Sequence, residues 1–127
     1  ECSTTVDLFS FDLVDGEAKF YKSGAAPSYV KRGNSIFRVR SQTVPLGLLR
    51  RVDAERIRVE VSFDDYVILL SDGISQSPED APWLLELLNK PAKRDLKAYA
   101  DTILATAVKY NARRDDMSVI VLHILAA

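Results

Sequence analysis

Two apolar runs that meet acidic residues decide the expected fold: VILLSDG at residues 67–73 and RRDDMSVIVL at residues 113–122. The first run ends at Asp72, and the second begins after Asp115 and Asp116. A short, continuous apolar run is typical of a strand that is buried on both faces. If the two strands are adjacent and antiparallel, Asp72 and Asp115 meet at one sheet edge. Carboxylates grouped in this way suit Mg²⁺ or Mn²⁺, so the sequence predicts a metal site there.

The bulk properties favour one ordinary globular domain. The chain has 127 residues, of which 47% are hydrophobic and 28% are charged, so it can bury a core and is not of the disordered type. Its 17 Lys and Arg nearly balance its 18 Asp and Glu, which argues against a nucleic-acid partner. Cys2 is the only cysteine, so no internal disulfide can form, and we expect a reducing, cytoplasmic setting. No apolar stretch approaches the length of a membrane span.

Alternating polar and apolar residues, together with the two continuous apolar runs, predict several antiparallel strands. We expect them at residues 5–14, 18–23, 29–31, 36–39, 56–63, 67–70 and 117–125. Asp15 and Gly16 predict a two-residue turn between the first two strands. In the stretch 56–63, the residues expected on the buried face are Ile57, Val59, Val61 and Phe63.

Two helices are expected between the last two strands. Pro82 suits a first helical turn, and Trp83 and the leucines after it should lie in a core or an interface. A longer helix is expected at residues 93–110, with an apolar stripe made of Leu96, Ala100, Ile103, Leu104, Ala107 and Val108. Strands followed by a helical pair and one last strand predict an α+β domain with helices on a sheet face.

Four blocks in order resemble one family. They are GAAPS with KRG (residues 24–28 and 31–33), PLGLL (45–49), LLSDG (69–73) and DDMSV (115–119). Because these blocks occur in this order, the chain resembles the metal-dependent protein Ser/Thr phosphatases of the type 2C class, also called PPM. Within that class it is most similar to the phosphatase domains of the stage II sporulation protein E family.

The resemblance implies a fold and a metal centre. The fold would be an antiparallel β-sandwich flanked by helices, with two Mn²⁺ or Mg²⁺ ions at one edge. A water or hydroxide bridging the ions would attack phosphoserine directly, and Asp72 and Asp115 would both be ligands of one ion. Arg113 and Arg114 are candidates for phosphate contacts. Asp116 is expected to support the ligands or lie at the surface.

One departure limits what this chain can do alone. The family has an upstream Asp-Gly-x-Gly element whose aspartate bridges the two metals, and DGEA at residues 15–18 does not fit it. Residues 1–127 are therefore expected to be the C-terminal portion of a single phosphatase domain, incomplete on its N-terminal side. Alone it should be inactive and bind metal weakly. We also expect exposed apolar residues, either Phe9, Phe11 and Leu13 or Leu96, Ile103 and Leu104, to mediate self-association or contact with the missing segment as a separate piece.

The resemblance also implies a cellular role. The substrate would be a phosphorylated anti-anti-sigma factor, whose dephosphorylation leads to activation of a sporulation sigma factor by partner switching. The domain would be cytoplasmic, in a parent protein anchored to the membrane of a sporulating bacterium by segments outside this chain. Two alternatives stay open: a catalytically silent interaction module on the same fold, and a stress-response phosphatase that regulates another sigma factor. His123 lies inside the last expected strand, away from the acidic edge, and is given no catalytic role.

Overall fold

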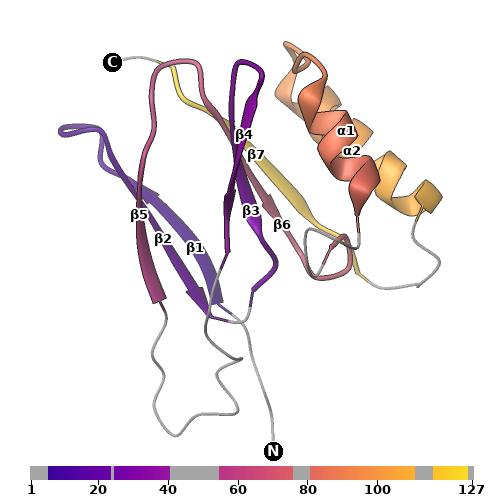
Figure 1. Ribbon diagram of the computed structural model, residues 1–127, viewed down its shortest axis with the longest axis horizontal. Coiled ribbons are helices and arrows are strands. Elements are labelled where there is room, and N and C mark those ends of the chain that lie inside the picture. The colour runs from indigo at the N-terminus through magenta and orange to yellow at the C-terminus, as the bar shows by residue number, and fades with distance from the viewer. Residues whose placement is uncertain (1–5, 24, 41–54, 76–80, 111–115, 126–127) are drawn as a thin grey trace, which may run out of the picture.

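Two antiparallel sheets face each other, and two helices cover the outer face of one of them in the computed structural model (Figure 1). The structure describes residues 6–23, 25–40, 55–75, 81–110 and 116–125. The three-stranded sheet has the order β1 (Val6–Phe11), β2 (Glu17–Ser23) and β5 (Glu55–Glu60). The four-stranded sheet has the order β4 (Ser35–Val39), β3 (Ser28–Arg32), β6 (Tyr66–Leu70) and β7 (Val119–His123). The helices are α1 (Pro82–Asn89) and α2 (Leu96–Tyr110). The predicted α+β class and sandwich are confirmed.

Strand β6 is buried on both faces, as its apolar run predicts. Val67 belongs to the core between the two sheets, where it packs with Phe20 and Val30. The next residue, Ile68, belongs to the core under the helices. Both Val67 and Ile68 are 0% exposed, because successive side chains in a strand point to opposite faces.

The alternation in residues 56–63 is confirmed for Ile57, Val59 and Val61, which pack against the core between the sheets. The prediction for Phe63 is wrong, since this side chain is 69% exposed. Strand β5 ends at Glu60, and the chain then leaves the three-stranded sheet to enter β6 in the other one. The period of two therefore ends before Phe63.

The apolar stripe of α2 is rotated from the predicted one. Ile103 and Ala107 are buried as expected, but Val108 is 63% exposed, so that prediction is wrong. The residue that the prediction left out is Tyr99, which is 2% exposed and packs edge-on to Tyr66 of β6. Tyr99, Ile103 and Ala107 recur every four residues and form the face that meets the sheet. In α1, Trp83 lies in the core, as predicted.

The turn between β1 and β2 is longer than the predicted two-residue turn. The last paired residues of the ladder are Phe11 and Ala18, and Asp12 and Glu17 are joined by one further backbone hydrogen bond. The Asp12 carboxylate accepts a hydrogen bond from the Val14 N–H at 2.8 Å, which stabilises a wider turn. Gly16 closes this turn with a φ of +73°, a conformation that glycine adopts without strain.

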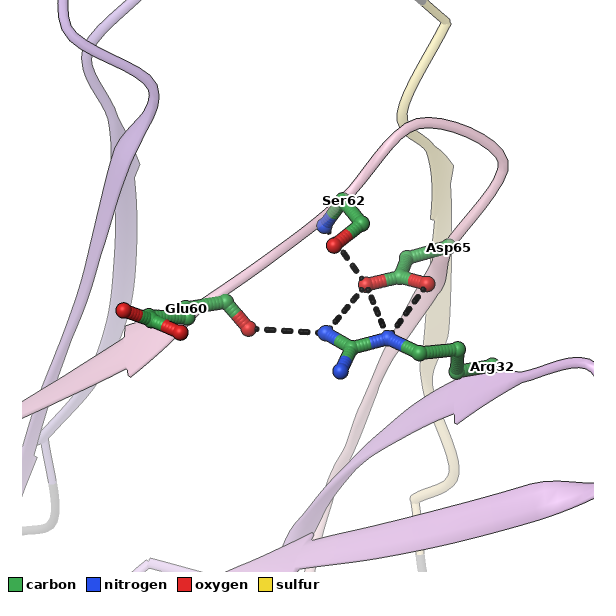
Figure 2. Close-up of polar contacts among 4 residues, drawn as sticks. All are labelled: Arg32, Glu60, Ser62 and Asp65. Atoms are coloured by element: carbon green, nitrogen blue, oxygen red, sulfur yellow. Dashed lines mark hydrogen bonds and ion pairs between the residues drawn. The ribbon is translucent and has the colours of Figure 1, made fainter.

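A buried acidic residue joins the two sheets at the end opposite the predicted metal site. Asp65 precedes β6, is 1% exposed, and accepts hydrogen bonds from the Arg32 side chain at the end of β3. The same guanidinium donates to the backbone oxygen of Glu60 in β5 at 3.0 Å (Figure 2). Arg32 therefore contacts both sheets where the chain passes from one to the other.

The apolar faces expected to be uncovered are mostly packed. The Phe9 and Phe20 rings lie 4.9 Å apart between the sheets, and Ile103 is 0% exposed, so these parts of the prediction are wrong. Leu13 is 85% exposed, but it lies in the β1–β2 turn and not on a strand face. Self-association stays a prediction. Neither described helix is long and apolar enough to cross a membrane.

Candidate metal centre

The end of β6 lies beside the start of β7, as the two apolar runs predict. The strands are antiparallel, and Leu70 pairs with Val119 at this end. Ser71 continues the pairing beyond the strands: its N–H donates to the Ser118 oxygen at 3.0 Å, and its hydroxyl accepts from the Ser118 N–H at 2.9 Å. The Ser71 hydroxyl also lies 3.4 Å from the Asp116 backbone oxygen. Ser71 thus fixes the turn that carries Asp72 against the segment that carries Asp116.

A surface hollow opens at this edge of the sheet. Its lining residues are Asp7, Ala25, Ala26, Leu70, Ser71, Asp72, Gly73 and Asp116. Three of the eight are aspartates, and they come from three separate segments of the chain. The volume of about 440 Å³ has room for a cation that keeps several of its waters, since a water takes roughly 30 Å³.

Two of the five predicted site residues are described by the structure, and both line this hollow. They are Asp72, which is half-buried, and Asp116, which is exposed. The other three, Asp115, Arg113 and Arg114, lie outside the described residues. The expected approach of the Asp72 and Asp115 carboxylates therefore stays a prediction.

Asp7 is a residue of the hollow that sequence reasoning missed. It lies on β1, and its carboxylate forms an ion pair with the Lys22 ammonium at 2.7 Å. Burial raises the pKa of Asp7 above its ordinary value; the hydrogen bond and charge of Lys22 oppose this shift, while the charge of Asp72 adds to it. A signal for the pair exists in the sequence, because Lys22 is in phase with Phe20 on the buried face of β2. A charge on such a face needs a partner.

The hollow fits part of a coordination shell for a hard cation. Among the described residues that line it, the side-chain donors are oxygens and there is no histidine or cysteine, which suits Mg²⁺ or Mn²⁺ better than softer metals. Within the described residues, no group of three or more His, Cys, Asp or Glu side chains lies close enough together to hold an ion. Asp72 would therefore share the ion with water and with residues beyond the described ones.

His123 lies at the other end of β7 and is paired with Tyr66 across the ladder. Its Nε2 lies 2.7 Å from the Asp64 carboxylate, and its ring stacks on Tyr66 with the centroids 4.0 Å apart. These contacts occupy the His123 side chain four ladder positions away from Leu70, at the end of the sheet opposite the hollow. That His123 has no catalytic role stays a prediction.

Known proteins share this sequence and architecture. The family model for stage II sporulation protein E (SpoIIE) matches residues 1–125. The chain is 29% identical over 130 residues to stage II sporulation protein E of Bacillus subtilis (strain 168), covering 98% of this chain and 16% of that protein. It also superposes on the phosphatase domain of the Bacillus subtilis cell fate determinant SpoIIE, from Mn-presoaked material, with a TM-score of 0.78 and 28% identity. That match covers 98% of this chain and 57% of the other.

A second Bacillus subtilis structure holds the PP2C phosphatase domain of SpoIIE with a fragment of its regulatory domain. It matches with a TM-score of 0.80 and 29% identity over 94% of this chain and 37% of that one. The chain thus spans about a sixth of the curated relative and little more than half of the phosphatase-domain structure. The match of the family model to nearly the whole sequence, with the same sandwich, shows that the chain belongs to the stage II sporulation protein E family of type 2C phosphatases.

Proposed function

We propose that residues 1–127 are the C-terminal part of a metal-dependent protein serine/threonine phosphatase domain. The observation that carries this proposal is the meeting of the Asp72 turn and the start of β7 at one acidic hollow, in a chain of this family. The Mn-presoaked relative supports a metal-dependent reaction. Mn²⁺ or Mg²⁺ is the cofactor proposed for this chain.

The residues of this chain would hold and orient the metal centre. Asp72 would bind a cation, and Ser71 would keep the Asp72 turn in place through its hydrogen bonds to the β7 segment. When bound, a pair of such ions lowers the pKa of a water and offsets the charge of the phosphoryl oxygens. Asp115 is proposed as the second carboxylate on the same ion. The phosphate of the substrate is proposed to contact Arg113 and Arg114, which directly precede Asp115 in the sequence.

The substrate that we propose is a phosphoserine protein of the anti-anti-sigma type, whose dephosphorylation activates a sporulation sigma factor. This rests on membership in the SpoIIE family, whose Bacillus subtilis relative is a cell fate determinant. The parent protein is proposed to be membrane-anchored, with this domain on the cytoplasmic side. A stress-response sigma regulator would instead be supported if a phosphoprotein of that pathway were the better substrate.

The test is phosphate release from a phosphoserine protein by the complete phosphatase domain of the parent, titrated with Mn²⁺. We expect Asp72→Asn and Asp115→Asn each to lower kcat/KM on the order of 10³-fold, since several kcal/mol of charge stabilisation depend on the ions. Residues 1–127 alone should show little turnover and weak Mn²⁺ binding by calorimetry. The matched control is Asp101→Asn, because Asp101 is an exposed carboxylate on α2 that pairs with Lys97.

Two results would count against the proposal. Full activity in Asp72→Asn would remove the metal role of this edge. A complete domain that binds the phosphoprotein without Mn²⁺-dependent turnover would support the silent interaction module instead.

A further inference from the structure

Lys22 is a buried cation next to the acidic hollow. It lies on β2, its side chain is 0% exposed, and the two residues before it on the same strand face, Phe20 and Ala18, are also buried. Its ammonium donates to the Asp7 carboxylate at 2.7 Å and to the Ser28 hydroxyl at 2.8 Å. A lysine is rarely fully buried unless it is paired in this way.

The ammonium is held between the two sheets. Asp7 and Lys22 are directly opposite each other in the β1–β2 ladder of the three-stranded sheet. Ser28 is the first residue of β3 in the four-stranded sheet. The contact therefore joins the sheets at the end where the hollow opens, and Ala25 and Ala26 of the connecting segment form part of the wall of the hollow.

Lys22 interacts with the charges of two aspartates of the hollow. Burial lowers the pKa of Lys22, and the hydrogen bond and charge of Asp7, followed by the charge of Asp72, oppose that shift. Asp7 and Asp72 thus both attract this ammonium, but Asp7 is the one within hydrogen-bonding distance. Without Asp7, Asp72 would be the remaining one of these two carboxylates that attracts the Lys22 ammonium.

We propose that Asp7 is a positioning residue for the metal centre: it binds the Lys22 ammonium and so keeps the Asp72 carboxylate available to a cation. The inference rests on the proposed metal-dependent function and deepens it, because it gives a role to two residues outside the metal ligands. A cation that competes for Asp72 would weaken metal binding, since Lys22 and the metal have charges of the same sign.

The test is a double-mutant cycle on Mn²⁺ affinity, measured by calorimetry on the complete phosphatase domain. The variants are Asp7→Asn, Lys22→Met and the double variant, with Asp7→Glu as the charge-conserving control. We expect Asp7→Asn to weaken Mn²⁺ binding about tenfold, as is typical for the loss of one compensating charge in a partly buried site. Lys22→Met should bind Mn²⁺ at least as tightly as the wild type, and the double variant should return to within about threefold of it. Asp7→Glu should also stay within about threefold.

Other patterns would overturn the inference. If the double variant binds as weakly as Asp7→Asn, Asp7 is itself a metal ligand. If no variant changes Mn²⁺ affinity and only the thermal unfolding temperature of the metal-free domain falls, the pair is a structural clamp alone. If Asp7→Asn does not fold, the double variant decides by itself, because it leaves no buried charge unpaired: a tenfold loss of affinity rejects the inference.

Failure of the proposed function gives a different result. Asp72→Asn should weaken Mn²⁺ binding whether or not Asp7 has the role inferred for it. An unchanged affinity in Asp72→Asn, or a wild-type domain that does not bind Mn²⁺, rejects the metal site itself and the inference with it. A strong effect of Asp72→Asn with a failed cycle rejects only the role of Asp7.

Discussion

Replacing Asp65 by asparagine should weaken the contact between the two sheets at the end opposite the metal site and so lower the stability of the domain. The Asp65 carboxylate accepts hydrogen bonds from Arg32 Nε at 3.1 and 3.2 Å, from Arg32 Nη2 at 2.8 Å and from the Ser62 N–H at 2.7 Å. The substitution keeps the size of the side chain but removes its charge. The asparagine NH₂ group takes the place of one carboxylate oxygen and faces the N–H donors of Arg32 or Ser62. At least one hydrogen bond is therefore replaced by a contact between two donors.

The expected loss follows from the exposure of the partners. Hydrogen bonds to a charged group contribute about 1.5–3 kcal/mol each when buried. The Arg32 side chain is 41% exposed, so its hydrogen bonds to Asp65 are partly screened by solvent and together contribute about 1 kcal/mol. The Ser62 bond to the buried carboxylate adds about 1–2 kcal/mol. We therefore expect Asp65→Asn to lower the free energy of unfolding by about 2–3 kcal/mol, which is a fall in Tm of about 5–10 °C for a domain of this size class.

The assay is equilibrium unfolding of the complete domain in urea, followed by circular dichroism, with Tm measured in parallel. Arg32→Lys should cost less than Asp65→Asn, because it keeps the charge and loses the paired geometry. Asp101→Asn, at the exposed ion pair on α2, should leave the unfolding midpoint unchanged. A loss below about 0.5 kcal/mol in Asp65→Asn would refute the reasoning, because it would mean that the hydrogen bonds of this buried carboxylate do not stabilise the crossing between the sheets.

Two further predictions concern side chains that the metal site does not use. The hydroxyl of Tyr99 is buried without a hydrogen-bond partner in the described part of the chain, and burial raises the pKa of Tyr99 to about 12. The unfolded chain loses this proton near pH 10 while the folded protein keeps it, so stability should fall as the pH rises from 10 towards 12. Tyr99→Phe should lessen that fall and leave stability at pH 7 unchanged or up to about 1 kcal/mol higher; a clear loss at pH 7 in urea unfolding would mean that the hydroxyl has a partner. His123→Gln should leave phosphatase kcat/KM within about twofold of the wild type, because His123 lies at the far end of β7; a large fall in kcat in a steady-state assay would contradict this placement.

The sequence alone determined the elements whose pattern is local. The apolar run of β6 predicted burial on both faces, and the directions of the two runs predicted that β7 lies antiparallel beside β6 at the end that holds Asp72. Burial on both faces is wrong for β7, which is the last strand of the described four-stranded sheet and leaves Ile120 56% exposed. Both helices were predicted from their apolar spacing. These features follow from side-chain periodicity and chain direction, which a sequence contains in full. The acidic edge was predicted for the same reason.

The tertiary structure decided what depends on residues far apart in the chain. Asp7 and Asp72 are 65 positions apart, and they line one hollow only because the start of β1 and the end of β6 lie on the same side of two facing sheets. The exposure of Phe63 was equally non-local, because it depends on where the chain leaves one sheet for the other. Tyr99 meets the sheet through the rotation of α2 about its own axis, which packing against β6 and β7 fixes. Local periodicity gives each strand and helix its faces, but only the packing of the layers determines which faces meet and which charges are buried together.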